Sequence, residues 1–164
     1  MSVSFETLLT LPRVRVGAVG RVVLSAFEGL GDMDGVVRVQ RAVLGYARRT
    51  RGTVGSLVLV TDGRGAVKGG DDAQRSAFLE VLRETEKSIA ATAVVVASEG
   101  FGGAALRAFV SGVSLVARTP YPLKVFSAFG DGRDWLVDRV ADAPDRAGVC
   151  AELDRGLKAW TVAG

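Results

Sequence analysis

The chain has 164 residues, of which 48% are hydrophobic, and it carries a formal net charge of +3. This length fits one domain with one core, and the absence of histidine excludes Ser-His-Asp and Cys-His nucleophiles and histidine-containing metal sites. The single cysteine, Cys150, excludes an internal disulfide and the usual zinc ligand sets, so we expect a chain that is not an enzyme and needs no cofactor.

The start of the chain and its apolar runs predict a cytoplasmic protein. Residues 1–6 contain no basic residue and no small-residue cleavage site follows residues 8–11, so we expect no signal peptide. No apolar run approaches the roughly 18 residues that a membrane span needs. The modest positive charge permits weak electrostatic contact with nucleic acid and does not predict a specific nucleic-acid partner.

The spacing of apolar residues predicts five strands and five helices. Strands are indicated by period-two alternation or short continuous apolar runs, and helices by apolar residues three or four apart. In chain order we expect a lead-in at 1–12, strands at 13–16 and 21–28, a helix from about 34 to 50 stopped by Gly52, a strand at 54–61, a helix from 71 or 72 to 89, a strand at 91–97, a helix at 101–118, a strand at 123–129, and helices at 131–141 and 145–160.

The order β-β-α-β-α-β-α-β-α-α predicts an α/β fold with a mixed, mostly parallel five-stranded sheet. The continuous apolar runs at 57–60 and 93–97 are typical of central strands buried on both faces. Strands joined by helices should lie parallel, whereas the hairpin at the start adds one antiparallel strand. We expect the domain over residues 13–142, with the helix within 143–164 packed on it.

Three stretches of sequence stand out beside this order of elements. They are Gly20-Arg21-Val22-Val23-Leu24 with Phe27-Glu28-Gly29, the apolar strand ending at Thr61-Asp62, and Arg118 to Phe126 followed by Asp134-Trp135-Leu136. Together with the order of elements they resemble the STAS domain, and in particular its SpoIIAA-like branch. The resemblance covers roughly residues 13–142 and implies a small mixed sheet with helices mostly on one side. It also implies a regulatory role through protein binding, without catalysis.

Anti-sigma-factor antagonists of that family carry a phosphorylatable serine in an Asp-x-Ser setting after the corresponding strand. Residues 62–70 contain neither serine nor threonine, and Ser76 lies a turn or more inside the next helix. We therefore expect no phosphorylation switch in this loop. The SpoIIAA-like branch also implies an alternative role, as a carrier or sensor of an apolar, lipid-like ligand at a membrane surface.

The glycine-rich loop after residue 61 is a candidate contact site through Asp62, Arg64 and Lys68. It fails the Walker pattern, because two glycines follow Lys68 in place of Gly-Lys-Ser/Thr. The aspartates at 71 and 72 also place negative charge where a phosphate would dock at the helix start. We expect a loop that is flexible or contacts a partner.

Asp62 ends a buried strand at the carboxyl edge of the sheet, where α/β proteins place their sites. With Asp32 or Asp34 it could hold magnesium, which would make the chain a carboxylate-dependent and metal-dependent enzyme. The simpler interpretation is that Asp62 bonds to the backbone of a turn while the other two aspartates cap a helix.

Two helices offer candidate surfaces. The first helix carries Arg38, Arg41, Arg48 and Arg49, which form either an ordinary solvated face or a contact for an acidic partner. The helix at 101–118 is apolar nearly all round, which indicates burial, a protein interface that includes self-association, or a lipid surface. Its candidate interaction residues are the small ones, Ala104, Ala108 and Gly112, and the polar ones, Arg107, Ser111 and Arg118.

Overall fold

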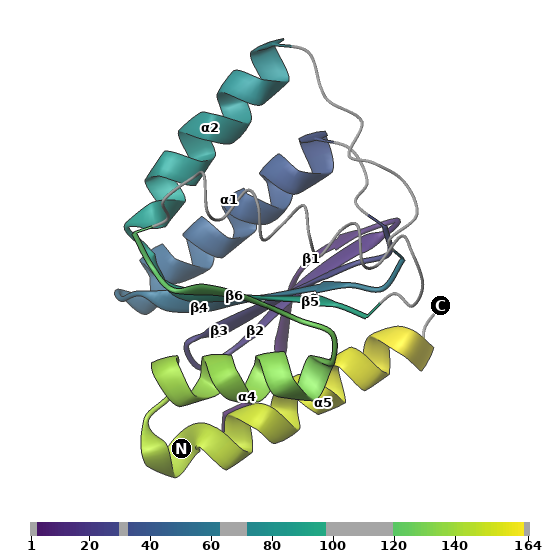
Figure 1. Ribbon diagram of the computed structural model, residues 1–164, viewed down its shortest axis with the longest axis vertical. Helices are drawn as coiled ribbons and strands as arrows, with labels where there is room; N and C mark the ends of the chain where they lie inside the picture. The colour runs from purple at the N-terminus through teal and green to yellow at the C-terminus, as the bar shows by residue number, and fades with distance from the viewer. Residues whose placement is uncertain (1–2, 30–32, 63–71, 98–119, 163–164) are drawn as a thin grey trace.

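Six strands form one sheet whose spatial order is the order of the chain, β1-β2-β3-β4-β5-β6 (Figure 1). The computed structural model describes residues 3–29, 33–62, 72–97 and 120–162. The strands are β1 (Glu6–Leu11), β2 (Val14–Val19), β3 (Val22–Phe27), β4 (Val54–Val60), β5 (Ile89–Val96) and β6 (Leu123–Phe126). The helices are α1 (Met33–Thr50), α2 (Asp72–Glu86), α4 (Phe129–Val140), the 3-10 helix η1 (Ala143–Asp145) and α5 (Arg146–Val162).

The sheet is mixed and mostly parallel, which confirms the predicted α/β class. Strand β2 pairs antiparallel with both β1 and β3, and the pairs β3–β4, β4–β5 and β5–β6 are parallel. The tight turn of the β2–β3 hairpin uses Gly20 at a φ of +57°, a conformation that glycine adopts without steric cost. The predicted helix at 101–118 and the loop from 63 to 71 lie outside the described residues.

The described residues form six strands, one more than predicted, because β1 lies within residues 1–12, for which the sequence predicts only a lead-in. Its pairing with β2 shifts register between Thr7 and Leu9, so the period-two alternation that marks a strand is broken. As a result Leu8, Leu9 and Leu11 all pack against the same core cluster. An edge strand with a bulge therefore carries no alternating signal that sequence reasoning could use.

One helix ends earlier than predicted, and another ends at the predicted residue but is followed by a different stop residue. Helix α2 ends at Glu86 instead of 89, because Ile89 pairs with Val54 as the first residue of β5. Helix α1 ends at Thr50, and the residue with positive φ after it is Arg51, at 55°, not the glycine at 52. The fifth predicted strand is shorter than expected as well, since β6 ends at Phe126 and α4 begins at 129.

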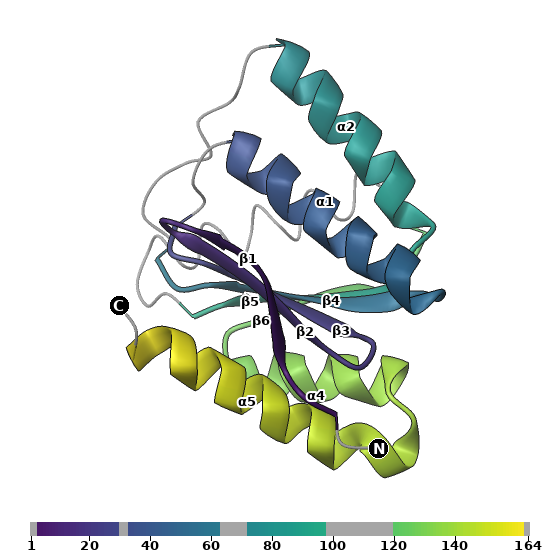
Figure 2. The ribbon, with the colours of Figure 1, turned by 180° about the vertical axis from the view of Figure 1, so that it is seen from behind.

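Helices cover both faces of the sheet, with α1 and α2 on one face and α4 and α5 on the other (Figures 1 and 2). The resemblance implied helices mostly on one side, so the described chain departs from it here. Each face has its own core. Val39, Val43 and Tyr46 of α1 belong to the first cluster, and Leu136 and Leu153 of α4 and α5 belong to the second. Among the described helices, none has both the length and the apolar character that a membrane span requires.

The N-terminal segment is held between β2 and α5. The Phe5 ring fills a slot between two glycines, since a Cβ built on Gly156 would lie 2.6 Å from its ring atoms, and one on Gly17 would also collide with it. The ring meets Trp160 edge-on at 5.2 Å between centroids, and the Phe5 backbone N–H donates to Glu152 Oε2 at 3.1 Å. The start of the chain is therefore part of the face that α5 covers.

Ser25 carries a buried hydroxyl in the middle of β3. The residue is 1% exposed, and among the described residues its Oγ has no hydrogen-bond partner. An unsatisfied buried hydroxyl costs about 1–3 kcal/mol, so Ser25→Ala is expected to raise the free energy of unfolding by about 1 kcal/mol in urea titrations. Thr85→Val is the matched comparison, because the buried Thr85 hydroxyl donates to Val81 O at 2.6 Å and no gain is expected. A Ser25→Ala variant that unfolds at lower urea concentration than the wild type would contradict this interpretation.

Candidate functional site

A pocket of about 330 Å³ opens where β1, β3 and β4 end, between the sheet and the last turns of α5. Figure 1 places the C-terminal end of α5 on the side where the parallel strands end. Open α/β sheets place ligands beyond the carboxyl ends of their strands, so this is the position where a site is expected. Its apolar lining includes Leu11, Val14, Ala26, Leu59, Leu157 and Trp160.

The polar lining of the pocket is mainly basic. Arg13 is exposed at the rim, while the half-buried Arg15 donates from Nη1 to the carbonyl oxygen of Trp160 at 2.9 Å. A cation at this carbonyl offsets the partial negative charge of the α5 C-terminus and holds the helix end against the sheet. Glu28 is the carboxylate of the lining, and its backbone N–H donates to Arg13 O at 2.9 Å.

Two threonine hydroxyls complete the lining, and both already donate to the backbone. Thr61 Oγ1 donates to Phe27 O at 3.3 Å, and Thr161 Oγ1 donates to Lys158 O at 2.8 Å. Each hydroxyl oxygen keeps lone pairs that can accept a hydrogen bond. The arrangement can therefore hold a small molecule with an apolar body and a polar end.

Asp62 lies next to this pocket, because it follows Thr61 at the carboxyl end of β4. The site predicted for this edge therefore lies beside the candidate pocket, and its binding of a partner or ligand stays a prediction. Asp34 is exposed in the first turn of α1. Within residues 3–29, 33–62, 72–97 and 120–162, no three carboxylate or thiol groups gather as a metal ion would need.

Most of the other predicted contact residues cannot be placed. Arg64, Lys68 and Asp32 lie outside the described residues. So do all six residues proposed for the helix at 101–118: Ala104, Arg107, Ala108, Ser111, Gly112 and Arg118. Their interaction with a partner stays a prediction from the sequence.

The arginines of α1 lie on an exposed face, and two of them pair with acids. Arg49 Nη2 lies 2.6 Å from Glu6 Oε1, and Arg48 Nη2 lies 3.7 Å from Glu84 Oε2. Arg48 also borders a concavity of about 350 Å³ between α1 and α2, with Glu84 on its opposite side. Exposed ion pairs of this kind contribute about 0–1 kcal/mol each to the free energy of unfolding. They are therefore typical of an ordinary charged face.

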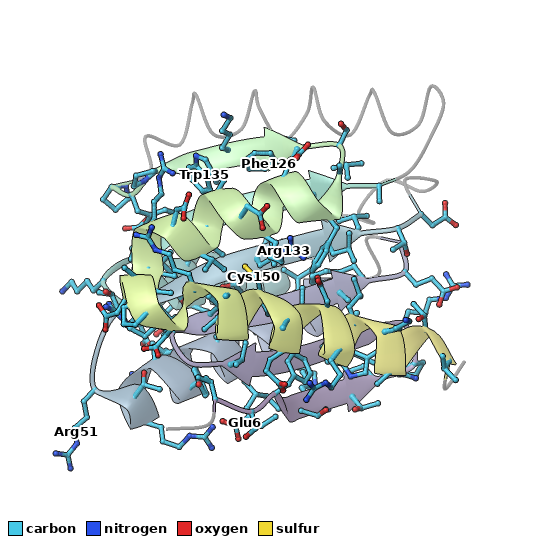
Figure 3. All side chains as sticks on the ribbon, turned by 90° about the horizontal axis from the view of Figure 1, so that it is seen from below. Glu6, Arg51, Phe126, Arg133, Trp135 and Cys150 are labelled. Atoms are coloured by element: carbon cyan, nitrogen blue, oxygen red, sulfur yellow. The ribbon has the colours of Figure 1, made fainter. Side chains whose placement is uncertain are left out.

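A polar cluster joins α4 to α5 on the far side of the molecule from α1 (Figure 3). Arg133 donates from Nη1 to Asp154 Oδ2 at 2.6 Å and from Nε to Asp134 Oδ1 at 2.8 Å. Cys150 lies beside it, with Sγ 3.8 Å from Asp134 Oδ1. Partial burial raises the pKa of the Cys150 thiol, and Asp134 adds to the rise while Arg133 opposes it. A raised pKa leaves less thiolate at neutral pH, which makes Cys150 a poor nucleophile.

Sequence reasoning missed the pocket because its walls come from segments far apart in the chain. The apolar lining residues look like ordinary core positions. One signal was present, namely that Arg13 and Arg15 alternate with Val14 along a strand. Two cations on one face of a buried strand indicate that this face meets something polar at its end.

Comparisons with known proteins show which fold the chain has and nothing about its activity. No family model matches the chain. No curated protein matches it in sequence. Among solved structures, the chain is similar to an uncharacterized protein of the DUF3478 family from Shewanella loihica PV-4, described as having a SpoIIAA-like fold. The two share 14% sequence identity with a TM-score of 0.51, over 82% of this chain and 94% of that one. The sheet and the helices on its faces therefore form a SpoIIAA-like fold.

Proposed function

We propose that the chain is a non-enzymatic regulatory domain of STAS type that acts by binding. The observation that carries the proposal is the pocket at the carboxyl end of the sheet, with an apolar floor and two arginines at its mouth. Ligand pockets in proteins combine mostly apolar walls with a few placed polar groups, and this lining has that composition. We place this activity in the cytoplasm.

The chemistry of the lining favours binding over conversion. General acid–base catalysis needs a side chain that exchanges a proton near neutral pH, and arginine stays protonated throughout. The lining offers Glu28 and two arginines as its charged groups, and the threonine hydroxyls donate to backbone carbonyls with no base beside them in the lining. These groups suit recognition of a ligand rather than proton transfer to it.

The size of the pocket separates two binding roles. A volume of about 330 Å³ is at the small end of ligand pockets, which span roughly 300–1,000 Å³. This favours a sensor of a small molecule over a carrier of a whole lipid. A protein partner or a second copy of the chain would then respond to the occupied state, and we propose that residues 101–118, for which the sequence predicts an apolar helix, make that contact.

The test is to recover the protein from cells that naturally contain it and to identify small molecules released on denaturation by mass spectrometry. Ala26→Leu fills the pocket and is expected to lose the molecule, whereas Ala151→Leu, at an exposed position of α5, is expected to keep it. Incubation of the wild type with the recovered molecule should leave its NMR spectrum unchanged over hours, because the molecule is bound and not converted.

Two outcomes would contradict the proposal. The first is a molecule that the wild type consumes and the Ala26→Leu variant does not, which would make the pocket an active site. The second is equal recovery of the same molecule from the Ala26→Leu and Ala151→Leu variants, which would place binding elsewhere on the chain. Thermal melts of both variants confirm beforehand that they are folded.

A further inference from the structure

We infer that the ligand of the pocket at the ends of β1, β3 and β4 is a small organic acid with one carboxylate and a short apolar body. The inference rests on the proposed binding role and adds the chemical class of the molecule. It follows from the charges at the mouth of the pocket, from the free donors of Arg15, and from the apolar floor behind them.

The two arginines at the mouth have donors left for a ligand. Within the described part of the chain, neither Arg13 nor Arg15 lies within ion-pair distance of a carboxylate. Arg15 donates from Nη1 to Trp160 O, and a guanidinium carries five N–H donors in all. An arginine held by one neutral carbonyl and facing a cavity is suited to a carboxylate, which matches its planar fork.

The charged side chains of the lining favour a single negative charge on the ligand. Among the lining residues, Arg13 and Arg15 carry two positive charges and Glu28 carries one negative charge, while Asp62 follows the lining residue Thr61 and is not itself part of the lining. The C-terminus of α5, which ends at this pocket, adds a partial negative charge of about half a unit. A monoanion can pair with the two guanidinium groups, whereas the second charge of a phosphate monoester would be repelled by Glu28 and the helix end.

The floor of the pocket requires an apolar body of limited length. Leu59, Leu157 and Ala26 face the cavity together with Trp160, and the volume leaves room for a short chain or one ring. Each methylene buried there should tighten binding about fourfold until the cavity is full. Binding should therefore strengthen by roughly fifteenfold from hexanoate to octanoate, which differ by two methylenes.

The experiment titrates the full chain with four compounds that share one tail: octanoate, 1-octanol, octyl phosphate and octylammonium. Binding is followed in ¹H–¹⁵N NMR spectra through the indole signal of Trp160, identified by its loss in Trp160→Phe, and through the amides of Arg15 and Thr61. Octanoate is expected to shift these signals with an affinity about tenfold above that of octanol. Octyl phosphate and octylammonium should bind more weakly than octanoate.

Arginine variants test which side chains bind the carboxylate of octanoate. Arg13→Gln, at an exposed position, should weaken octanoate about fivefold and leave octanol unchanged. Arg15→Lys keeps the charge and removes the planar fork, so it should also weaken octanoate selectively. Arg38→Gln, on the exposed face of α1, is the control and should change neither affinity.

The outcomes separate the ligand class from the binding role. If octanol binds at the pocket as tightly as octanoate and Arg13→Gln has no effect, the acid inference is overturned while the pocket remains a binding site. Three other results would also overturn the acid inference. They are tighter binding of octyl phosphate than of octanoate, octanoate-induced shifts at residues outside the pocket only, and no NMR shift with any of the four compounds. The proposed function fails separately, through conversion of the native molecule or its retention in Ala26→Leu.

Discussion

Replacing Gly156 by alanine is expected to lower the free energy of unfolding by about 1–2 kcal/mol. The added methyl group would lie 2.6 Å from the Phe5 ring, which must then leave its slot between α5 and β2. Overpacking of a filled core site typically costs about 1–3 kcal/mol, and alanine recovers up to about 1 kcal/mol through its helix propensity. Urea titration followed by tryptophan fluorescence measures the loss.

Gly148→Ala is the matched control, because it lies in the same helix with nothing within 4 Å of the added methyl group. It is expected to leave stability unchanged or to raise it by up to about 1 kcal/mol. A double-mutant cycle identifies the cause. Phe5→Ala alone should cost about 3 kcal/mol, and Gly156→Ala in that background should cost nothing further. Additive losses in the double variant would show that the ring is not what the methyl group meets.

Gly132→Ala is expected to lower the free energy of unfolding by a similar amount, about 1–2 kcal/mol. Gly132 lets α4 approach β5, and a Cβ there would lie 2.5 Å from Val95 Cγ2 and 3.3 Å from the Phe126 ring. Val95 is fully buried and branched at Cβ, so its rotamer cannot change freely and the helix has to move. The thermal midpoint should fall by about 2–8 °C.

Gly130→Ala, two residues earlier in α4, is the control for this effect. Its added methyl group would come no closer than 4.0 Å to the end of the Arg133 side chain, which is ordinary contact. We expect no loss of stability there. Equal losses in both variants would mean that α4 tolerates no alanine for reasons of backbone conformation, and the close approach to Val95 would then explain nothing.

Sequence patterns predicted the fold class because the central strands have an unambiguous signature. The apolar runs of β4 and β5 are buried on both faces, and the helical spacing of Val39 and Val43 follows the buried side of α1. The bulge in β1 removed its alternation, and Ile89 suits a helix end as well as a strand start. Boundaries of this kind depend on pairing partners, which local sequence does not contain.

The candidate site was predictable only as a location. Asp62 marked the carboxyl edge of β4, and the pocket lies beside it. Its walls could not be foreseen, because they depend on where the end of α5 packs, and that position is set by Phe5, Gly156 and the Arg15 bond to Trp160. Contacts between the two ends of a chain leave no periodic trace in either end.

During synthesis, Phe5 is made well before the helix α5 that it contacts. The hydrogen bond from Phe5 to Glu152 joins residues separated by 147 positions. At about 5–20 residues per second a ribosome needs roughly 7–30 s to make the intervening chain. Until then the face of the sheet formed by Leu24 and Leu57 has no α5 to cover it. The apolar residues on this face therefore stay uncovered by α5 until residues 146–162 have been made.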